Sequence, residues 1–167
     1  LNNLLEACRT ASGQKKMIFP SSALIYGQPE ILPIKENFEA KPLGIYSWHK
    51  YICEKMIRAY HENYGLECVI LRLFNVYGPR QSLNAYSGVI TQFMDRANKG
   101  LPLVIFGDGG LTRDFVHVWD VADAVLNSLK TDGVGTGLFN IGFGEATSLN
   151  ELAKAVLDLA GKDLRVR

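Results

Sequence analysis

The chain has 167 residues, and its 47% hydrophobic and 21% charged residues are typical of a soluble globular domain. Its 18 basic and 17 acidic residues give a net charge of +1, which argues against nucleic acid or an anionic membrane surface as a partner. The three cysteines lie far apart and the three histidines lack metal-ligand spacing, so we expect a reducing, cytoplasmic compartment and no metal site. No apolar run is long enough to span a membrane.

The first half of the chain reads as a helix, a strand, a long loop and a second helix. Apolar residues at helical spacing predict a helix over 1–11, and Gly13 ends the pattern. Because this pattern is already under way at residue 1, we expect the sequence to be a piece of a longer chain. The apolar run 17–20 predicts a buried strand, and the polar stretch 21–41 predicts a binding loop. A helix over 45–64, ended by Gly65, follows.

The second half continues the alternation of strands and helices. We expect strands at 68–74, 103–106, 115–118 and 138–141, a turn at 75–80, and helices at 89–99, from Asp120 to 129, and after Ser148. Ser148 and Glu151 have the spacing of a capping box at the start of the last helix. Alternating strands and helices predict an α/β fold with a mainly parallel sheet.

Two groups of polar residues point to chemistry. Tyr46 and Lys50 lie four residues apart on the predicted helix and therefore share a face, where a lysine ammonium stabilises a tyrosine phenolate. Such a tyrosine can exchange a proton with a sugar hydroxyl. Ser21 and Ser22 follow the first predicted strand and Asn75 follows the next, at the strand ends where open α/β sheets bind ligands. Each feature alone also fits ordinary surface or turn chemistry.

Four segments in this order resemble the extended short-chain dehydrogenase/reductase family, and within it the nucleotide-sugar epimerases of the UDP-glucose 4-epimerase type. They are FPSSALIYG at 19–27, YSWHK at 46–50, LRLFNVYGPR at 71–80 and GDGGLTRDFVHV at 107–118. The resemblance covers nearly the whole chain. It implies a Rossmann-like fold with a doubly wound parallel sheet whose first half is missing. Residues 1–78 would be the second half of the NAD-binding domain, and 79–167 a substrate-binding subdomain with returning Rossmann elements.

The resemblance also implies a role for particular residues. Ser22, Tyr46 and Lys50 would be catalytic, with Tyr46 as the acid/base. The residues implied to contact the cofactor NAD are Pro20, Ser21, Tyr46, Lys50 and Phe74. Those implied to contact the nucleotide-sugar substrate are Ser22, Asn75, Val89 and Arg113. Arginine suits a diphosphate because its planar fork makes bidentate contacts.

The implied reaction is NAD-dependent epimerisation of a UDP-sugar of the glucose/galactose type at C4, through a transient ketone. Ala23 stands where dehydratases and decarboxylases of the family carry Asp or Glu, which favours epimerisation over a 4,6-dehydratase; a reductase is a further alternative. Outside catalysis, a nucleotide-binding protein or an inactive fragment on the same fold stays open. Full-length relatives commonly form homodimers, and Ile52, Met56 and Ala59 offer a second apolar stripe that serves either such a dimer or the core.

One expected part of the cofactor site is absent from the sequence. The family places a glycine-rich phosphate loop after its first strand, and no such loop is present. The glycines at 133, 135 and 137 precede a predicted strand instead of following one, so we interpret them as a turn.

Overall fold

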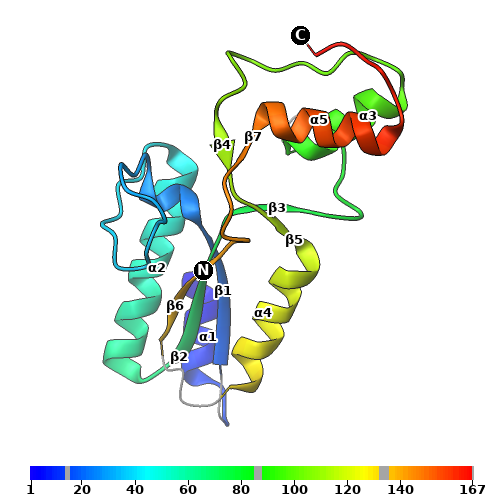
Figure 1. Cartoon of the computed structure of the whole chain (residues 1–167). Coiled ribbons are helices and arrows are strands. Elements are labelled where there is room, and N and C mark those ends of the chain that lie inside the picture. Colours follow the sequence, from blue (N-terminus) through cyan, green and yellow to red (C-terminus); the bar gives the residue numbers. More distant parts are fainter. Residues whose placement is uncertain (14–15, 85–87, 132–135, 167) are drawn as a thin grey trace. The chain divides into compact units, whose positions relative to one another are not determined.

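The computed structural model describes residues 1–13, 16–84, 88–131 and 136–166, so most of the 133–137 glycine segment lies outside the described residues. The chain divides into two compact units (Figure 1). Unit 1 comprises Leu1–Phe74 and Asp120–Ile141, and unit 2 comprises Asn75–Trp119 and Gly142–Arg167. Each unit is described by itself below.

Unit 1 is built on a parallel sheet of three strands, β1 (Lys16–Ser22), β2 (Glu67–Leu73) and β6 (Leu138–Ile141), in the order β1-β2-β6. The sheet lies between helices α2 and α4 in Figure 1. The middle strand β2 is buried over five consecutive residues, as expected for a parallel strand covered on both faces. The predicted α/β fold with a parallel sheet is confirmed.

The helices of unit 1 are α1 (Asn2–Thr10), α2 (Ile45–Tyr64) and α4 (Val118–Lys130), whose first two residues belong to unit 2. A short 3₁₀ helix, η1 (Ala23–Tyr26), follows β1 directly. The predicted span of α2 is confirmed, and Gly65 ends it in the left-handed conformation that a side chain disfavours. The core of unit 1 packs α1 and α2 against β1 and β2, and its buried residues are Leu5, Ile57, Leu66, Cys68 and Ile70.

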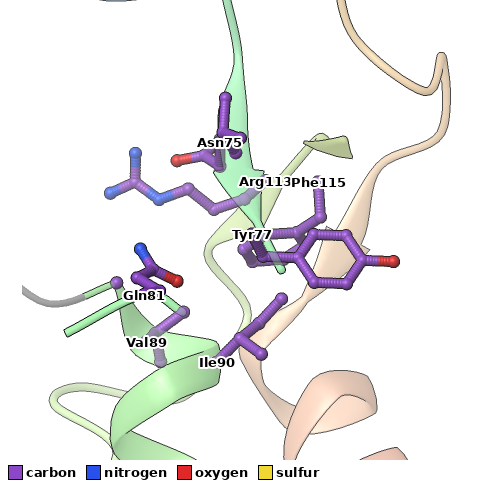
Figure 2. Close-up of a pocket in the computed structure, with 9 residues that line it drawn as sticks. Asn75, Tyr77, Gln81, Val89, Ile90, Arg113 and Phe115 are labelled. Atoms are coloured by element: carbon purple, nitrogen blue, oxygen red, sulfur yellow. The ribbon is translucent and has the colours of Figure 1, made fainter. Parts of the chain in front are cut away.

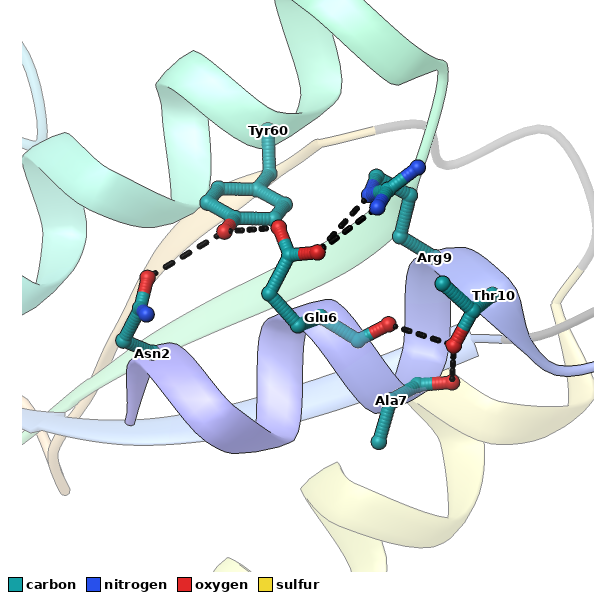
Figure 3. A network of polar contacts seen from close by, with 6 residues as sticks. All are labelled: Asn2, Glu6, Ala7, Arg9, Thr10 and Tyr60. Carbon is teal, nitrogen blue, oxygen red and sulfur yellow. Dashed lines mark hydrogen bonds and ion pairs between the residues drawn. The ribbon is translucent and has the colours of Figure 1, made fainter.

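A polar network joins α1 to α2 on the surface of unit 1 (Figure 3). The Tyr60 hydroxyl donates to the Glu6 carboxylate and lies 3.2 Å from the Asn2 side-chain oxygen. Arg9 donates two hydrogen bonds to the same carboxylate and stacks on the Tyr64 ring. These contacts fix the packing of α1 against the C-terminal half of α2.

The described residues of unit 2 form two packed helices, α3 (Val89–Asn98) and α5 (Leu149–Ala160), and two short strand pairs. β3 (Asn75–Tyr77) runs parallel to β5 (Phe115–His117), and β4 (Thr112–Arg113) runs antiparallel to β7 (Thr147–Ser148). The predicted capping box of α5 is confirmed, because Ser148 accepts from the Glu151 amide and Glu151 from the Ser148 amide. The buried core residues are Phe93, Ala97, Leu103, Leu152, Ala153 and Val156.

Three predicted elements are wrong in detail. The segment 103–106 is not a strand: Leu103 makes one bridge to Val166, while Phe106 is 91% exposed. The predicted turn after β2 begins instead with strand β3, whose partner β5 lies forty residues along the chain. Helix α4 begins at Val118, so Asp120 lies in its first turn and is not its N-cap. None of the helices in the described ranges is long and apolar enough to cross a membrane.

Candidate functional site

Unit 1 brings Tyr46 and Lys50 together at the end of β1. The Lys50 ammonium donates a 2.7 Å hydrogen bond to the backbone carbonyl of Pro20. It lies 5.7 Å from the centre of the Tyr46 ring and 5.1 Å from that of Phe19. The prediction that Tyr46 and Lys50 share one helix face is therefore confirmed. The bond to Pro20 uses one of three ammonium hydrogens and leaves two for another acceptor.

Tyr46 itself is open to solvent. It lies in the first turn of α2, and its side chain is 56% exposed. Within the part of the chain that the structure describes, its hydroxyl makes no hydrogen bond, so a ligand hydroxyl can reach it. An exposed phenol beside a fixed ammonium can exchange a proton with a bound hydroxyl group.

The two serines after Pro20 differ in what they contact. Ser22 is the N-cap of η1, and its side-chain oxygen accepts a 3.2 Å hydrogen bond from the Leu24 amide. Its hydroxyl proton remains available to donate. Ser21 is 3% exposed and donates a 2.6 Å hydrogen bond to the Glu54 carboxylate. The Ser21 hydroxyl is therefore used in a hydrogen bond in the interior of unit 1. Its predicted contact with a cofactor stays a prediction.

The sequence interpretation missed a buried ion pair beneath this site. Glu54 lies one turn beyond Lys50 on α2, and Arg72 pairs with Ser21 in the register of β2 with β1. Arg72 donates to both Glu54 oxygens, at 3.0 and 2.7 Å, with both side chains at most 5% exposed. The signal for this pair is an arginine within an otherwise apolar strand, since a buried charge needs a partner.

The same arginine connects the site to the loop that follows η1. Burial, the largest single influence, lowers the pKa of Arg72, but the neighbouring Glu54 carboxylate and Tyr26 together outweigh it. The pKa is therefore raised above its ordinary value, and the guanidinium stays charged. The guanidinium carbon lies 4.5 Å from the centre of the Tyr26 ring. The Tyr26 hydroxyl donates to Asn140 on β6, and Asn140 donates to the Ile34 carbonyl. Part of the predicted binding loop is thus held against the sheet.

Phe74, the other residue predicted to contact the cofactor, ends the first segment of unit 1. Its backbone amide donates a 3.0 Å hydrogen bond to the Ile141 carbonyl, next to the end of β6. The side chain is only partly buried. Its predicted contact with a nicotinamide ring stays a prediction.

Unit 2 holds a pocket of about 340 Å³ that contains three of the predicted substrate-binding residues (Figure 2). The predicted residues are Asn75, Val89 and Arg113. In Figure 2 the polar ends of Asn75 and Arg113 lie on one side of the pocket and the Tyr77 hydroxyl lies on the other. The remaining lining residues, which sequence reasoning did not name, are Val76, Tyr77, Gln81, Gly88, Ile90 and Phe115.

The chemistry of this pocket suits an anion attached to a flat apolar group. Arg113 supplies a charged fork, and Asn75 supplies a side-chain amide. Gly88 and Val89 are the N-cap and first residue of α3, and no acidic residue occupies its first turn. The N-terminus of a helix directs free N–H groups and partial positive charge toward an anion. Apolar side chains such as Phe115 complete the wall.

A metal centre receives no support in the described ranges. No cluster there of three or more His, Cys, Asp or Glu residues has a geometry that holds a metal ion.

Comparison with known proteins gives the class to which this fold and these residues belong. Residues 1–142 match the model of the NAD dependent epimerase/dehydratase family, and the chain belongs to that family.

Among curated relatives, a putative UDP-glucose 4-epimerase of Methanocaldococcus jannaschii is 43% identical over 150 residues, covering 90% of this chain and 48% of the relative. The UDP-N-acetylglucosamine 4-epimerase of Methanobrevibacter ruminantium, solved with UDP-N-acetylmuramic acid, superposes with a TM-score of 0.93 at 35% identity, covering 99% of this chain and 54% of that one. The UDP-glucose 4-epimerase of Thermus thermophilus, solved with NAD, superposes with a TM-score of 0.88 at 37% identity over the same shares. The chain thus spans about half the length of the relatives it matches.

Proposed function

We propose that this chain carries the catalytic pair and the nucleotide pocket of an enzyme that epimerises a UDP-sugar of the glucose/galactose type at C4, with NAD as cofactor. The observation that carries the proposal is the Lys50 ammonium, fixed on the Pro20 carbonyl next to the exposed Tyr46 phenol. The relatives named as UDP-sugar 4-epimerases support it.

The proposed proton transfer follows from this geometry. Tyr46 takes the proton of the sugar hydroxyl and returns it at the end of the cycle, while the neighbouring Lys50 charge stabilises the phenolate. Ser22 donates its hydroxyl hydrogen to the reacting sugar oxygen, since its own oxygen already accepts from Leu24.

The residues at the end of β1 fit NAD as the redox partner. Two free hydrogens on the Lys50 ammonium can bind ribose hydroxyls, and the exposed Pro20 and partly buried Phe74 offer backbone and apolar surface to a nicotinamide. When bound there, NAD⁺ would supply a reversible hydride acceptor for the sugar carbon.

In unit 2 the pocket would hold the nucleotide. Arg113, Asn75 and the N-terminus of α3 would bind the two phosphates, which carry the largest charge of such a substrate. Val89 and Phe115 would contact the apolar faces of the uridine.

Epimerisation is favoured over elimination by the residue after Ser22. Ala23 opens η1 and supplies no carboxylate for a second proton transfer. Dehydratases and decarboxylases of the family usually carry such a group at this position, so conversion of one sugar epimer into the other fits this site better.

The test uses protein expressed from the complete reading frame that encodes this chain. Conversion of UDP-galactose to UDP-glucose is measured for the parent and for Tyr46→Phe, with Tyr51→Phe on the same helix as the matched control. We expect Tyr46→Phe to lower kcat at least about 100-fold, as for loss of a general acid/base, and Tyr51→Phe to keep the parent rate. Full activity in Tyr46→Phe would instead support a nucleotide-binding protein without catalysis.

We also propose that the complete protein is a homodimer that pairs through the α1 and α2 surface. Leu4, Trp48 and Ile52 are each about half exposed there, and Ala59 is exposed, while Met56 packs into the core of unit 1. An apolar surface of this kind is typical of an interface between subunits. Sedimentation velocity should show a dimer for the parent and a monomer for Ile52→Asp.

A further inference from the structure

Asp114 neighbours two polar residues that line the pocket in unit 2, Arg113 in sequence and Asn75 through hydrogen bonds, and is not itself a lining residue. It follows Arg113 directly and precedes strand β5. One of its carboxylate oxygens accepts a 2.7 Å hydrogen bond from the Phe143 amide, and the other accepts a 2.8 Å bond from the Gly144 amide. These two hydrogen bonds hold the turn at 142–144 against the Asp114 carboxylate, and together they form the Asp114 clamp.

The backbone of the same residue holds Asn75. The Asp114 carbonyl accepts a 3.1 Å hydrogen bond from the Asn75 amide and a 2.8 Å bond from its side-chain nitrogen. One hydrogen of that nitrogen is used in this way, and the second remains for a ligand. The orientation of the Asn75 side chain therefore depends on where the Asp114 backbone lies.

The clamp is tightly fitted. A Cβ atom added to Gly142 would lie 2.6 Å from one Asp114 carboxylate oxygen, so only glycine fits beneath the carboxylate without a shift. Among the described residues, no lysine or arginine lies within ion-pair distance of Asp114, and backbone N–H groups balance its charge.

A carboxylate next to Arg113 has an electrostatic cost if the pocket binds phosphate. Like charges repel, so an acidic residue beside an anion site weakens binding unless it orders the groups that bind. The contacts of Asp114 hold neighbouring groups in place: its side chain binds the turn at 142–144, and its backbone carbonyl binds Asn75.

Resting on the function proposed above, we propose that Asp114 is a positioning residue that holds Arg113 and Asn75 in the geometry that binds the substrate diphosphate. The sign of the effect on binding separates this role from simple electrostatics. Removing the charge alone would strengthen the binding of an anion, whereas releasing the clamp weakens it.

The test measures UDP binding to the protein expressed from the complete reading frame, by isothermal titration calorimetry, for the parent, Asp114→Asn and Asp108→Asn. Asp108 is the matched control, because its exposed carboxylate also accepts from a backbone amide, that of Gly110, and lies outside the pocket. We expect Asp114→Asn to raise the Kd about tenfold, in line with losses of supporting residues around binding sites, and Asp108→Asn to leave it unchanged. In the complete protein, Asp114→Asn should raise KM for the UDP-sugar with kcat nearly unchanged.

A second variant, Gly142→Ala, covers the case in which Asp114→Asn does not fold. It keeps the charge and pushes on the carboxylate, so it should weaken UDP binding in the same direction. If the parent binds UDP and Asp114→Asn binds it equally or more tightly, the positioning role is overturned and the proposed nucleotide pocket stands. If the parent itself binds no UDP, the proposed pocket fails, and the role of Asp114 fails with it.

Discussion

Replacing Glu54 with alanine removes the carboxylate that neutralises a buried arginine. Arg72 would lose two hydrogen bonds, at 3.0 and 2.7 Å, and Ser21 would lose one, at 2.6 Å. Because the Arg72 side chain is only 5% exposed, water cannot replace these partners. We expect Glu54→Ala to lower the free energy of unfolding by about 3–5 kcal/mol, the cost of leaving one member of a buried pair uncompensated.

Urea unfolding followed by tryptophan fluorescence measures this change. The chain has two tryptophans, so a Trp119→Phe background leaves Trp48 on α2 as the single reporter of unit 1. The control is Glu39→Ala, which breaks the exposed pair with Lys41 in the same unit. Exposed pairs contribute little, and we expect this control to cost about 0.2–1 kcal/mol.

A double variant tests the physical reason for the effect. Glu54→Leu combined with Arg72→Met removes both charges together, and we expect it to recover most of the stability that Glu54→Ala loses. If Glu54→Ala costs no more than Glu39→Ala, the reasoning from a buried, uncompensated charge is refuted.

Two further predictions concern a thiol and a carboxylate. Burial, with a smaller influence of Cys8, raises the pKa of Cys68 to about 12. In a Cys8→Ser, Cys53→Ser variant, Ellman's reagent at pH 8 should therefore label Cys68 only when the chain unfolds. Rapid labelling of the folded variant would contradict this. Side-chain and backbone hydrogen bonds from Ser148 hold the pKa of Glu151 below its usual range. The ionised Glu151 carboxylate therefore stabilises α5 fully above about pH 4.5, and this stabilisation is lost as the pH falls through the lowered pKa of Glu151. Thermal melting from pH 6 to 3 should therefore show a smaller loss of Tm in Ser148→Ala than in the parent, and equal losses would contradict the capping role.

Local sequence patterns predicted the elements that local interactions determine. Helix α2 has a long apolar periodicity and a glycine stop, and α5 has a capping box, so both were placed well from sequence alone. The pairing of Tyr46 with Lys50 needs only the helical repeat and was predicted for the same reason.

Features that depend on partners far apart along the chain were not predicted from the sequence. The apolar run 103–106 was predicted to be a strand, yet among the described residues only its Leu103 makes a β-bridge. A segment forms a strand only where a neighbouring strand offers backbone hydrogen-bond partners, and the apolar pattern alone does not show whether one is there. Asn75 was expected in a turn because its strand partner, Phe115, is forty residues away. The pair of Glu54 and Arg72 was missed because charged residues usually indicate surface, and their contact is set by the packing of α2 on the sheet.

The way in which the chain crosses between the two units has a consequence for loop entropy. With respect to unit 1, the segment Asn75–Trp119 is one long insertion between Phe74 and Asp120. The entropy cost of closing an insertion grows only with the logarithm of its length, so doubling it costs about 0.6 kcal/mol. Unit 1 can therefore tolerate lengthening or replacement of this segment, which carries Asn75, Val89 and Arg113, at little cost to its own sheet. The pocket can in this way acquire a new ligand preference while the residues around Tyr46 stay as they are.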